Sequence, residues 1–333
     1  MSDLNTTDYG ARGALSAEAR EEGLVEVERA LSQLRREIET RFTKVPMQRS
    51  LRSVDWMAFF DDLRRRFSTF GMSERSGEID EFGMDEVVLL RSRALLDFLL
   101  QRYWRVEISG LGALPAPGPC LFVANRSGLL PYDGLAIAHV LAAQQPEAGQ
   151  PRFLVADWLI TLPFVQSYLA RLGGVRACRE NAERLLSQGQ RVIAFPEGQQ
   201  GAAKVFRKRY RLQRFGRGGV VRLAIERGVP LVPVAVVGAE EIHPILFKVG
   251  APARALGLPF LPVTPTFPAL GLFGFLPLPS KWGIHFGAPL PIESLGPDDA
   301  RDELLVARLT EELRQSIQSL LDEHLKDRKS IWS

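Results

Sequence analysis

Two polar segments stand out because each directly follows a short apolar run that is typical of a buried strand. They are Asn125–Asp133 and Phe195–Gly198. In an open α/β sheet, ligands bind beyond the carboxyl ends of the strands. The carboxylates Asp133 and Glu197 could orient a base or hold a cationic group there. Each segment alone is also what an ordinary strand-to-helix turn needs, and Asp133 could merely cap the next helix.

A basic run without any acidic residue follows the second segment. Phosphate groups and anionic lipid head groups would suit such a run. The alternative is a solvated loop whose cations pair with acidic residues elsewhere. No recognition motif supports nucleic-acid binding. The run consists of Lys204, Arg207, Lys208, Arg209, Arg211, Arg214 and Arg217.

None of the four histidines lies in either polar segment. A lone histidine is more often structural than catalytic. His243 follows the apolar run Leu231–Val237 and could approach the same edge of the sheet, which makes it the best of the four candidates for a site role. His139 and His324 fall on predicted helices, and His285 on a predicted strand.

The composition excludes several classes of protein. Of 333 residues, 46% are hydrophobic and 24% charged, as in an ordinary globular chain. The net charge of +3 gives no whole-molecule case for nucleic-acid binding. The two cysteines, Cys120 and Cys178, cannot form a disulfide framework or an all-cysteine zinc site. No metal site is expected, and Cys120 should pack inside a strand.

The elements that position these residues alternate between strand and helix from Arg105 onward. This alternation predicts an α/β fold with a largely parallel sheet covered by helices. The predicted strands are Arg105–Ile108, Cys120–Ala124, Arg152–Val155, Arg191–Phe195, Leu231–Val237 and Gly283–Phe286. The predicted helices are Gly134–Ala143, Trp158–Leu172, Glu180–Gln188, Arg217–Arg227 and Asp298–Leu325.

An N-terminal helical extension precedes this α/β domain. The spacing of apolar residues predicts helices over Gly23–Arg41, Leu51–Phe70 and Asp85–Trp104. The first should pack on the main domain or dimerise, and the third should be buried. The second has an aromatic face that either docks on the core or lies on a membrane surface. The expected organisation is a flexible tail (1–22), a helical extension (23–104), the α/β domain (105–290) and a C-terminal helix (291–333).

One long stretch, Ala255–Ser280, carries no charge and is rich in Leu and Phe. Its repeated prolines are incompatible with a spanning helix. It either inserts shallowly at a membrane interface or forms a buried lid. Because Met1–Glu22 has no apolar core flanked by basic residues, we expect no secretory signal there. The expected location is cytoplasmic, peripherally bound to the inner face of the membrane.

In this order along the chain, the two polar segments resemble blocks of the lysophospholipid (glycerolipid) acyltransferase superfamily, which includes the PlsC-like enzymes. Two further blocks support the resemblance: Leu172–Val175 followed by Arg179, and Val229–Val234. The Asn-x-Ser-Gly-x-x-Pro-x-Asp form of the first block resembles the monoacylglycerol and diacylglycerol acyltransferase-like branch. The resemblance covers about 104–290.

The resemblance implies transfer of an acyl group from acyl-CoA or acyl-carrier protein to the hydroxyl of a lysophospholipid or related glycerolipid. It implies membrane lipids as partners and no cofactor beyond the acyl donor. It assigns catalytic positions to Asp133, Glu197 and Arg126. The implied acceptor- or phosphate-binding residues are Asn125, Ser127, Arg179, Gly198, Lys204, Arg209 and Arg217.

The sequence departs from this family at one position. The family's first block has a histidine base where this chain has Arg126. A guanidinium cannot accept a proton near neutral pH, because its pKa exceeds ~12. Two hypotheses follow. The first is an acyltransferase that is impaired or uses another base. The second is an inactive homologue that binds lipid or acyl thioester as a sensor or scaffold, and in which Arg126 pairs with Asp133.

Overall fold

The computed structural model describes residues 79–128, 130–160, 165–250, 253, 260–326, 328 and 330–331. The chain divides into two compact units, 1–63 and 64–333, and all the described residues belong to the second. The expected tail and the expected helices Gly23–Arg41 and Leu51–Phe70 lie outside them.

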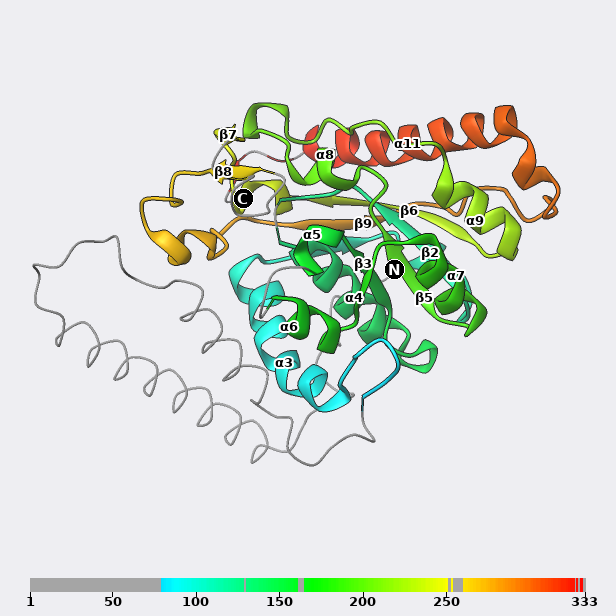
Figure 1. The fold of residues 1–333 in the computed structure, drawn as a ribbon, viewed down its shortest axis with the longest axis horizontal. Helices are drawn as coiled ribbons and strands as arrows, with labels where there is room; N and C mark the ends of the chain where they lie inside the picture. The colour runs from blue at the N-terminus through cyan, green and yellow to red at the C-terminus, as the bar shows by residue number, and fades with distance from the viewer. Residues whose placement is uncertain are drawn as a thin grey trace, which may run out of the picture. The chain divides into compact units, whose positions relative to one another are not determined.

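The second unit is built on a seven-stranded sheet of order β1-β9-β6-β2-β5-β3-β4 (Figure 1). All neighbouring strands are parallel except β6 and β9. The predicted α/β class with a largely parallel sheet is therefore confirmed. The strands are β1 (Glu107–Ser109), β2 (Cys120–Ala124), β3 (Arg152–Val155), β4 (Gly174–Arg176), β5 (Arg191–Ala194), β6 (Leu231–Val237) and β9 (Gly283–Phe286). A separate antiparallel pair consists of β7 (Phe247–Val249) and β8 (Leu261–Val263).

Helices cover both faces of the sheet. The helices are α3 (Glu86–Phe98), α4 (Tyr132–Gln144), α5 (Asp157–Ile160), α6 (Val165–Arg171), α7 (Arg179–Ser187), α8 (Gly198–Ala202), α9 (Gly219–Arg227) and α11 (Glu303–Lys326). A π-helical turn, η1 (Leu99–Tyr103), continues α3, and short 3-10 turns are η2 (Leu111–Ala113), η3 (Pro146–Ala148), η4 (Phe206–Lys208), η5 (Ala239–Glu241), η6 (Gly271–Phe275) and η7 (Asp299–Arg301).

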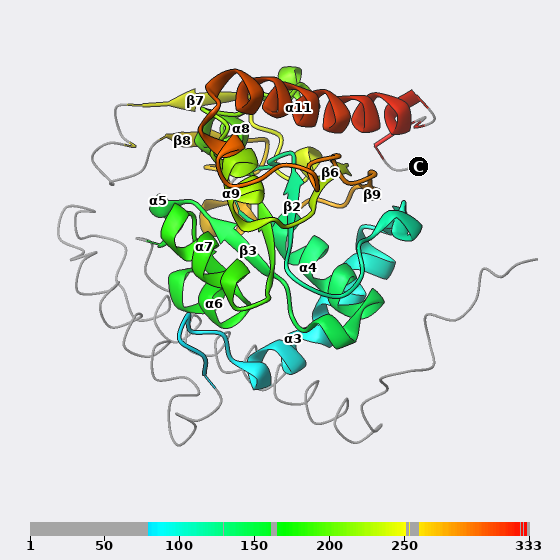
Figure 2. The same ribbon diagram turned by 90° about the vertical axis from the view of Figure 1, so that its right-hand side faces the viewer.

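The alternation of side chains along β2 creates two cores. Phe122 packs in the cluster that includes α4, α5 and α6, whereas Leu121 and Val123 pack with α7, α9 and α11. Figure 2 shows α11 over one face and α4 and α3 on the other. Cys120 is buried at the strand's start, as expected.

The expectation that Asp85–Trp104 forms a buried helix is wrong for most of its length. None of the side chains of α3 is buried, and Leu90, Leu95 and Phe98 are each about half exposed. The helix lies beside α4 and α6, and only its side that carries Val88, Leu89 and Leu96 packs against the core. The apolar residues of this segment occupy more sides of the helix than the rest of the fold covers.

Candidate active site

The two polar segments meet at one edge of the sheet, as predicted. Strand β2 lies between β5 and β6 and runs parallel to both, so the residues that follow these three strands emerge at the same edge. The backbone N–H of Arg126 donates a hydrogen bond of 2.8 Å to Glu197 Oε1. This buried bond joins the loop after β2 directly to the loop after β5.

Asp133 is fully buried and saturated with hydrogen bonds. Its Oδ1 accepts from Arg126 Nη1 and from the Gly134 N–H, both at 2.8 Å. Its Oδ2 accepts from the Ser127 N–H at 2.8 Å and the Ser127 hydroxyl at 2.9 Å. The guanidinium of Arg126 also lies over the ring of Phe195, 5.1 Å from its centroid. Arg126 and Asp133 thus form a buried ion pair where the sequence resemblance implies a base.

A second charged cluster lies beside the first. Lys204 Nζ lies 3.2 Å from Glu197 Oε2 and 2.8 Å from Glu240 Oε1. Burial alone would lower the pKa of Lys204, but the two carboxylates together raise it above its ordinary value. Burial raises the pKa of Glu240, an effect that Glu197 reinforces and Lys204 opposes. The lysine therefore keeps a fixed positive charge between two acids.

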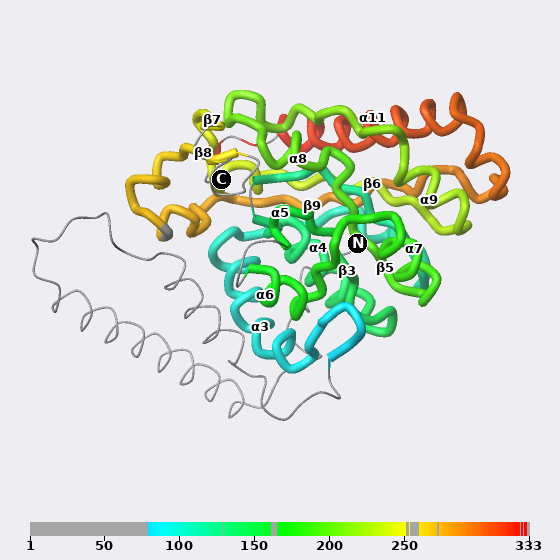
Figure 3. The backbone as a smooth tube through the Cα atoms, viewed as in Figure 1, coloured from blue at the N-terminus to red at the C-terminus, as the bar shows by residue number. Residues whose placement is uncertain are grey.

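Glu197 and Glu240 also anchor backbone. The Gln213 N–H donates to Glu197 Oε2 at 2.7 Å, and the Tyr210 N–H donates to Glu240 Oε2 at 3.1 Å. Both donors belong to the long connection between α8 and α9, which Figure 3 traces beside α11. The Leu212 N–H of this connection donates to Gln318 of α11 at 3.0 Å. The basic run is therefore held over the site by buried acids.

Close packing at this edge depends on one glycine. A Cβ on Gly201 of α8 would lie 2.6 Å from the Cβ of Glu197 and 2.7 Å from the Cβ of Arg126. No larger residue fits without moving the backbone that carries both charged groups.

The remaining predicted site residues differ in their surroundings. The side-chain amide of Asn125 bonds to the backbone N–H and carbonyl of Val236, at 2.7 and 3.0 Å, so it fixes the loop to β6. Gly198, with φ of +53°, begins α8. Arg179 is exposed and pairs with Glu183 and Glu226 rather than with any other predicted site residue. Arg217 is exposed and forms no ion pair within the described part of the chain.

The basic run divides into two groups. Lys204 and Arg209 are engaged, since Arg209 Nε lies 3.9 Å from Glu241 Oε1 and its guanidinium stacks over the ring of Phe206. The others are exposed and form no ion pair with the described residues. They are Arg207, Lys208, Arg211, Arg214 and Arg217.

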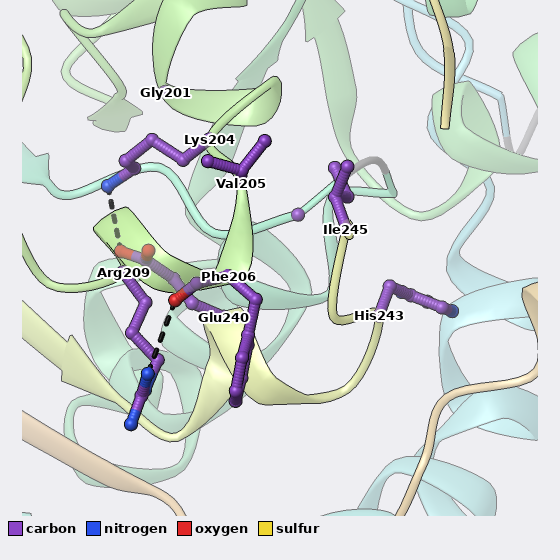
Figure 4. A pocket seen from close by; sticks show the side chains of 9 residues that line it. Gly201, Lys204, Val205, Phe206, Arg209, Glu240, His243 and Ile245 are labelled. Carbon is purple, nitrogen blue, oxygen red and sulfur yellow. Dashed lines mark hydrogen bonds and ion pairs between the residues drawn. The ribbon is translucent and has the colours of Figure 1, made fainter. Parts of the chain in front are cut away.

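A small pocket opens beside Lys204 (Figure 4). Figure 4 shows Lys204 joined to Glu240 on one side, with His243 apart from them on the other. The lining of this pocket also includes Gly128, Arg209 and Ile245. The cavity volume of this pocket, about 10 Å³, is near that of a single water-sized group. A larger pocket, about 200 Å³, lies at the carboxyl ends of β3 and β4.

Sequence reasoning missed Glu240 as a member of this site. Two features of the sequence could have identified it. It follows the carboxyl end of β6, which lies beside β2, and it is half of an adjacent acidic pair, Glu240 and Glu241. The basic run contains no acid of its own, so its buried members need partners from elsewhere.

No group of three or more His, Cys, Asp or Glu side chains among the described residues is arranged to hold a metal ion. None of the helices in the described ranges is both long enough and apolar enough to cross a membrane.

Comparisons with known proteins place this site in a family. Residues 105–237 match the family model Acyltransferase. An uncharacterized protein of Mycobacterium tuberculosis (strain H37Rv) is 41% identical over 255 residues, which is 76% of this chain and 71% of that protein. An uncharacterized protein of Mycobacterium leprae is 42% identical over 258 residues, 76% of this chain and 70% of that protein.

Among solved structures, the chain is similar to the crystal structure of the 1-acyl-sn-glycerophosphate acyltransferase PlsC from Thermotoga maritima. The sequence identity is 18% and the TM-score 0.45, with 82% of this chain and 90% of that chain covered. The family model spans β1 to β6. The matched residues include both polar segments and the basic run that precedes β6. The chain belongs to the acyltransferase superfamily that its sequence blocks resemble.

Proposed function

We propose that the protein transfers an acyl group from acyl-CoA or acyl-carrier protein to the hydroxyl of a lysophospholipid or a related glycerolipid. The observation that carries this proposal is the buried hydrogen bond from the Arg126 N–H to Glu197, which joins the two sequence blocks at one sheet edge inside the matched domain. Sites of open α/β sheets form at that edge.

The charges around this edge suit an anionic substrate. Five basic side chains of the run are exposed without ion pairs in the described part of the chain, and two further members of the run, Lys204 and Arg209, line the pocket. The phosphate of a lysophospholipid and the phosphates of coenzyme A are the groups that such cations bind. We assign these exposed residues to phosphate binding, and Glu197 and Asp133 to holding the loops in place.

The ion pair between Arg126 and Asp133 supports a second candidate function. Arg126 and Asp133 neutralise each other at 2.8 Å in a buried position, and neither can take a proton from a hydroxyl while they remain paired. A protein closed in this way would bind lipid or acyl thioester without transferring the acyl group.

Acceptor-dependent thiol release separates the two candidates. Purified full-length protein is incubated with labelled acyl-CoA and lysophosphatidic acid, with acyl-carrier protein as donor in a parallel series, beside an Arg126→His variant. The acyltransferase predicts free thiol and acylated lipid from the wild type. Thiol release by the variant alone would establish the inactive homologue, and binding of both substrates without release by either protein would contradict the proposed reaction.

We also propose that the protein binds the surface of a membrane. Large apolar side chains are more than half exposed on β7 and around η6: Leu246, Phe247, Leu270, Phe273 and Leu276. Figure 1 places β7, β8 and the yellow-to-orange segment that follows them at one end of the unit. Apolar side chains beside exposed cations are typical of surfaces that bind anionic lipid.

A further inference from the structure

One buried group near the site has no assigned role, and it is His243. The ring is 5% exposed and lines the pocket beside Lys204. Its Nδ1 is buried and has no hydrogen-bond partner among the described residues. An unsatisfied buried acceptor costs about 1–3 kcal/mol, so a position of this kind calls for an explanation.

The surroundings of the ring fix which nitrogen carries the proton. His243 Nε2 lies 2.7 Å from the carbonyl oxygen of Phe275. A carbonyl oxygen can only accept, so the N–H must be on Nε2. In the neutral ring the lone pair is therefore on Nδ1. The ring of Tyr132 stacks against the imidazole, with centroids 6.0 Å apart and planes at 29°, and this contact restricts its rotation.

The free nitrogen faces the loop that carries Arg126. Nδ1 lies 4.0 Å from the place where a Cβ on Gly128 would stand, and Gly128 is two residues after Arg126. Residue 128 is a glycine with φ of +73°, so it places no side chain of its own between the loop and the ring. The charged groups that line the same pocket are Lys204, Arg209 and Glu240. A small polar group that entered here would meet a neutral imidazole acceptor.

We propose that His243 Nδ1 is the proton acceptor of this enzyme, in place of the histidine that Arg126 replaces. The proposal rests on the proposed acyl transfer. The acceptor hydroxyl oxygen forms a bond to the thioester carbonyl carbon while its proton passes to Nδ1, and the C–S bond then breaks. The thiolate takes the proton back from the imidazolium, so that one ester and one thiol leave and His243 is neutral again.

The environment suits this role. Burial lowers the pKa of His243 below its ordinary value, and the bond to Phe275 opposes only part of that effect. The ring is therefore unprotonated at neutral pH, which is the form that a base requires. Arg126 then acts as a structural residue, because it neutralises Asp133 and so holds the loop in place opposite the ring.

Two substitutions separate the proton acceptor from a structural histidine. In His243→Gln, the amide nitrogen can still donate to the Phe275 carbonyl, but nothing remains at the Nδ1 position. In His243→Asn, an oxygen replaces Nδ1 as a hydrogen-bond acceptor but cannot take a proton near neutral pH. The matched control is His139→Gln, because His139 is also buried and its Nε2 lies 2.8 Å from Asp97 Oδ1.

We expect acceptor-dependent kcat to fall about 10²–10⁴-fold in both His243 variants and less than twofold in the His139 variant. Melting temperatures identify any variant that has lost its fold. The wild-type rate should decline toward acid pH with an inflection below ~6.5, the ordinary histidine pKa. In ¹⁵N spectra of histidine-labelled protein, the signals lost in His243→Gln should be those of a neutral ring protonated on Nε2.

The outcomes distinguish the two proposals. Thiol release by the wild type that survives in His243→Gln would overturn the role of His243 and leave the acyl transfer standing. A wild type that binds both substrates and releases no thiol would overturn the acyl transfer, and with it this assignment. A ring that is protonated on Nδ1 at pH 7 would contradict the assignment on its own.

Discussion

At the scale of single residues, the account depends on charges that are buried in pairs. Arg126 is 4% exposed and Asp133 0%, so each needs the other's charge. Removing one partner of a buried ion pair leaves an uncompensated charge in a medium that solvates it poorly. The loop between β2 and α4 therefore needs both members of the pair to keep its buried conformation.

We predict that Arg126→Ala lowers the free energy of unfolding by about 3–5 kcal/mol, as measured by urea denaturation. Adding Asp133→Asn to this variant removes the stranded charge, so the two substitutions should be non-additive by about 1–3 kcal/mol. A loss below ~1 kcal/mol for the single variant would show that the pair is not closed in solution.

A related prediction concerns Lys204, which separates two buried carboxylates. In Lys204→Met, Glu197 and Glu240 face each other without a cation, and the pKa of Glu240, already raised by burial, should rise further. A carboxyl whose pKa is raised in the fold stabilises the fold when it protonates, so this variant should be destabilised more at pH 8 than at pH 5. Urea denaturation at both pH values measures this, and the exposed Lys208→Met is the control. Equal losses at both pH values would contradict it.

At the scale of the elements, β9 and α11 meet through two histidines. The rings of His285 and His324 stack with centroids 3.3 Å apart, and His285 Nδ1 lies 2.8 Å from the hydroxyl of Ser109. Burial lowers the pKa of His285 to about 4, and the proximity of His324 contributes. The contact between β9 and α11 therefore favours the neutral form of His285 over its protonated form.

The sign of the resulting pH dependence follows from that shift. The unfolded histidine binds its proton at about pH 6.5, before the folded one does, so stability is complete above that pH and falls between about 6.5 and 4. We predict a loss of about 1–3 kcal/mol over this interval. Urea denaturation should show a smaller loss in His285→Gln, and an identical pH profile in this variant would contradict the assignment.

The elements also show how far the sequence alone determines this fold. Four strands have the predicted bounds, because they are mostly apolar and a strand that is buried on both faces shows no regular polar alternation. They are Cys120–Ala124, Arg152–Val155, Leu231–Val237 and Gly283–Phe286. Strand β4 is absent from the predicted strands, because Gly174 and two further residues are too short to show a period. Strands β7 and β8 gave no signal, because β8 carries a central proline.

Part of the site was also predictable from the sequence. Parallel strands bring the residues after them to one edge, so the meeting of Arg126 and Glu197 followed from the topology. The partners of Lys204 and the orientation of His243 did not, because both depend on how the turn after β6 packs. Composition cannot indicate which of several acids and histidines a turn directs inward.

At the scale of the whole molecule, the proposed membrane surface can be tested without reference to activity. We predict that the Phe247→Ser, Phe273→Ser double variant binds vesicles of anionic phospholipid at least about tenfold more weakly than the wild type, because two half-exposed aromatic rings leave the interface. Vesicle co-sedimentation measures the binding. Leu304→Ser is the matched control, since Leu304 is 84% exposed and belongs to α11 rather than to β7 or η6. Equal weakening in the control would contradict the assigned surface.

The central claim is the proposed acyl transfer by a chain in which Arg126 stands where the sequence resemblance implies a histidine base. The most direct measurement is thiol release from acyl-CoA by the wild-type protein, with and without lysophosphatidic acid in vesicles. Release that requires the acceptor and yields one acylated lipid per thiol is the predicted result. Bound vesicles and bound acyl-CoA with no thiol above the uncatalysed rate would contradict it.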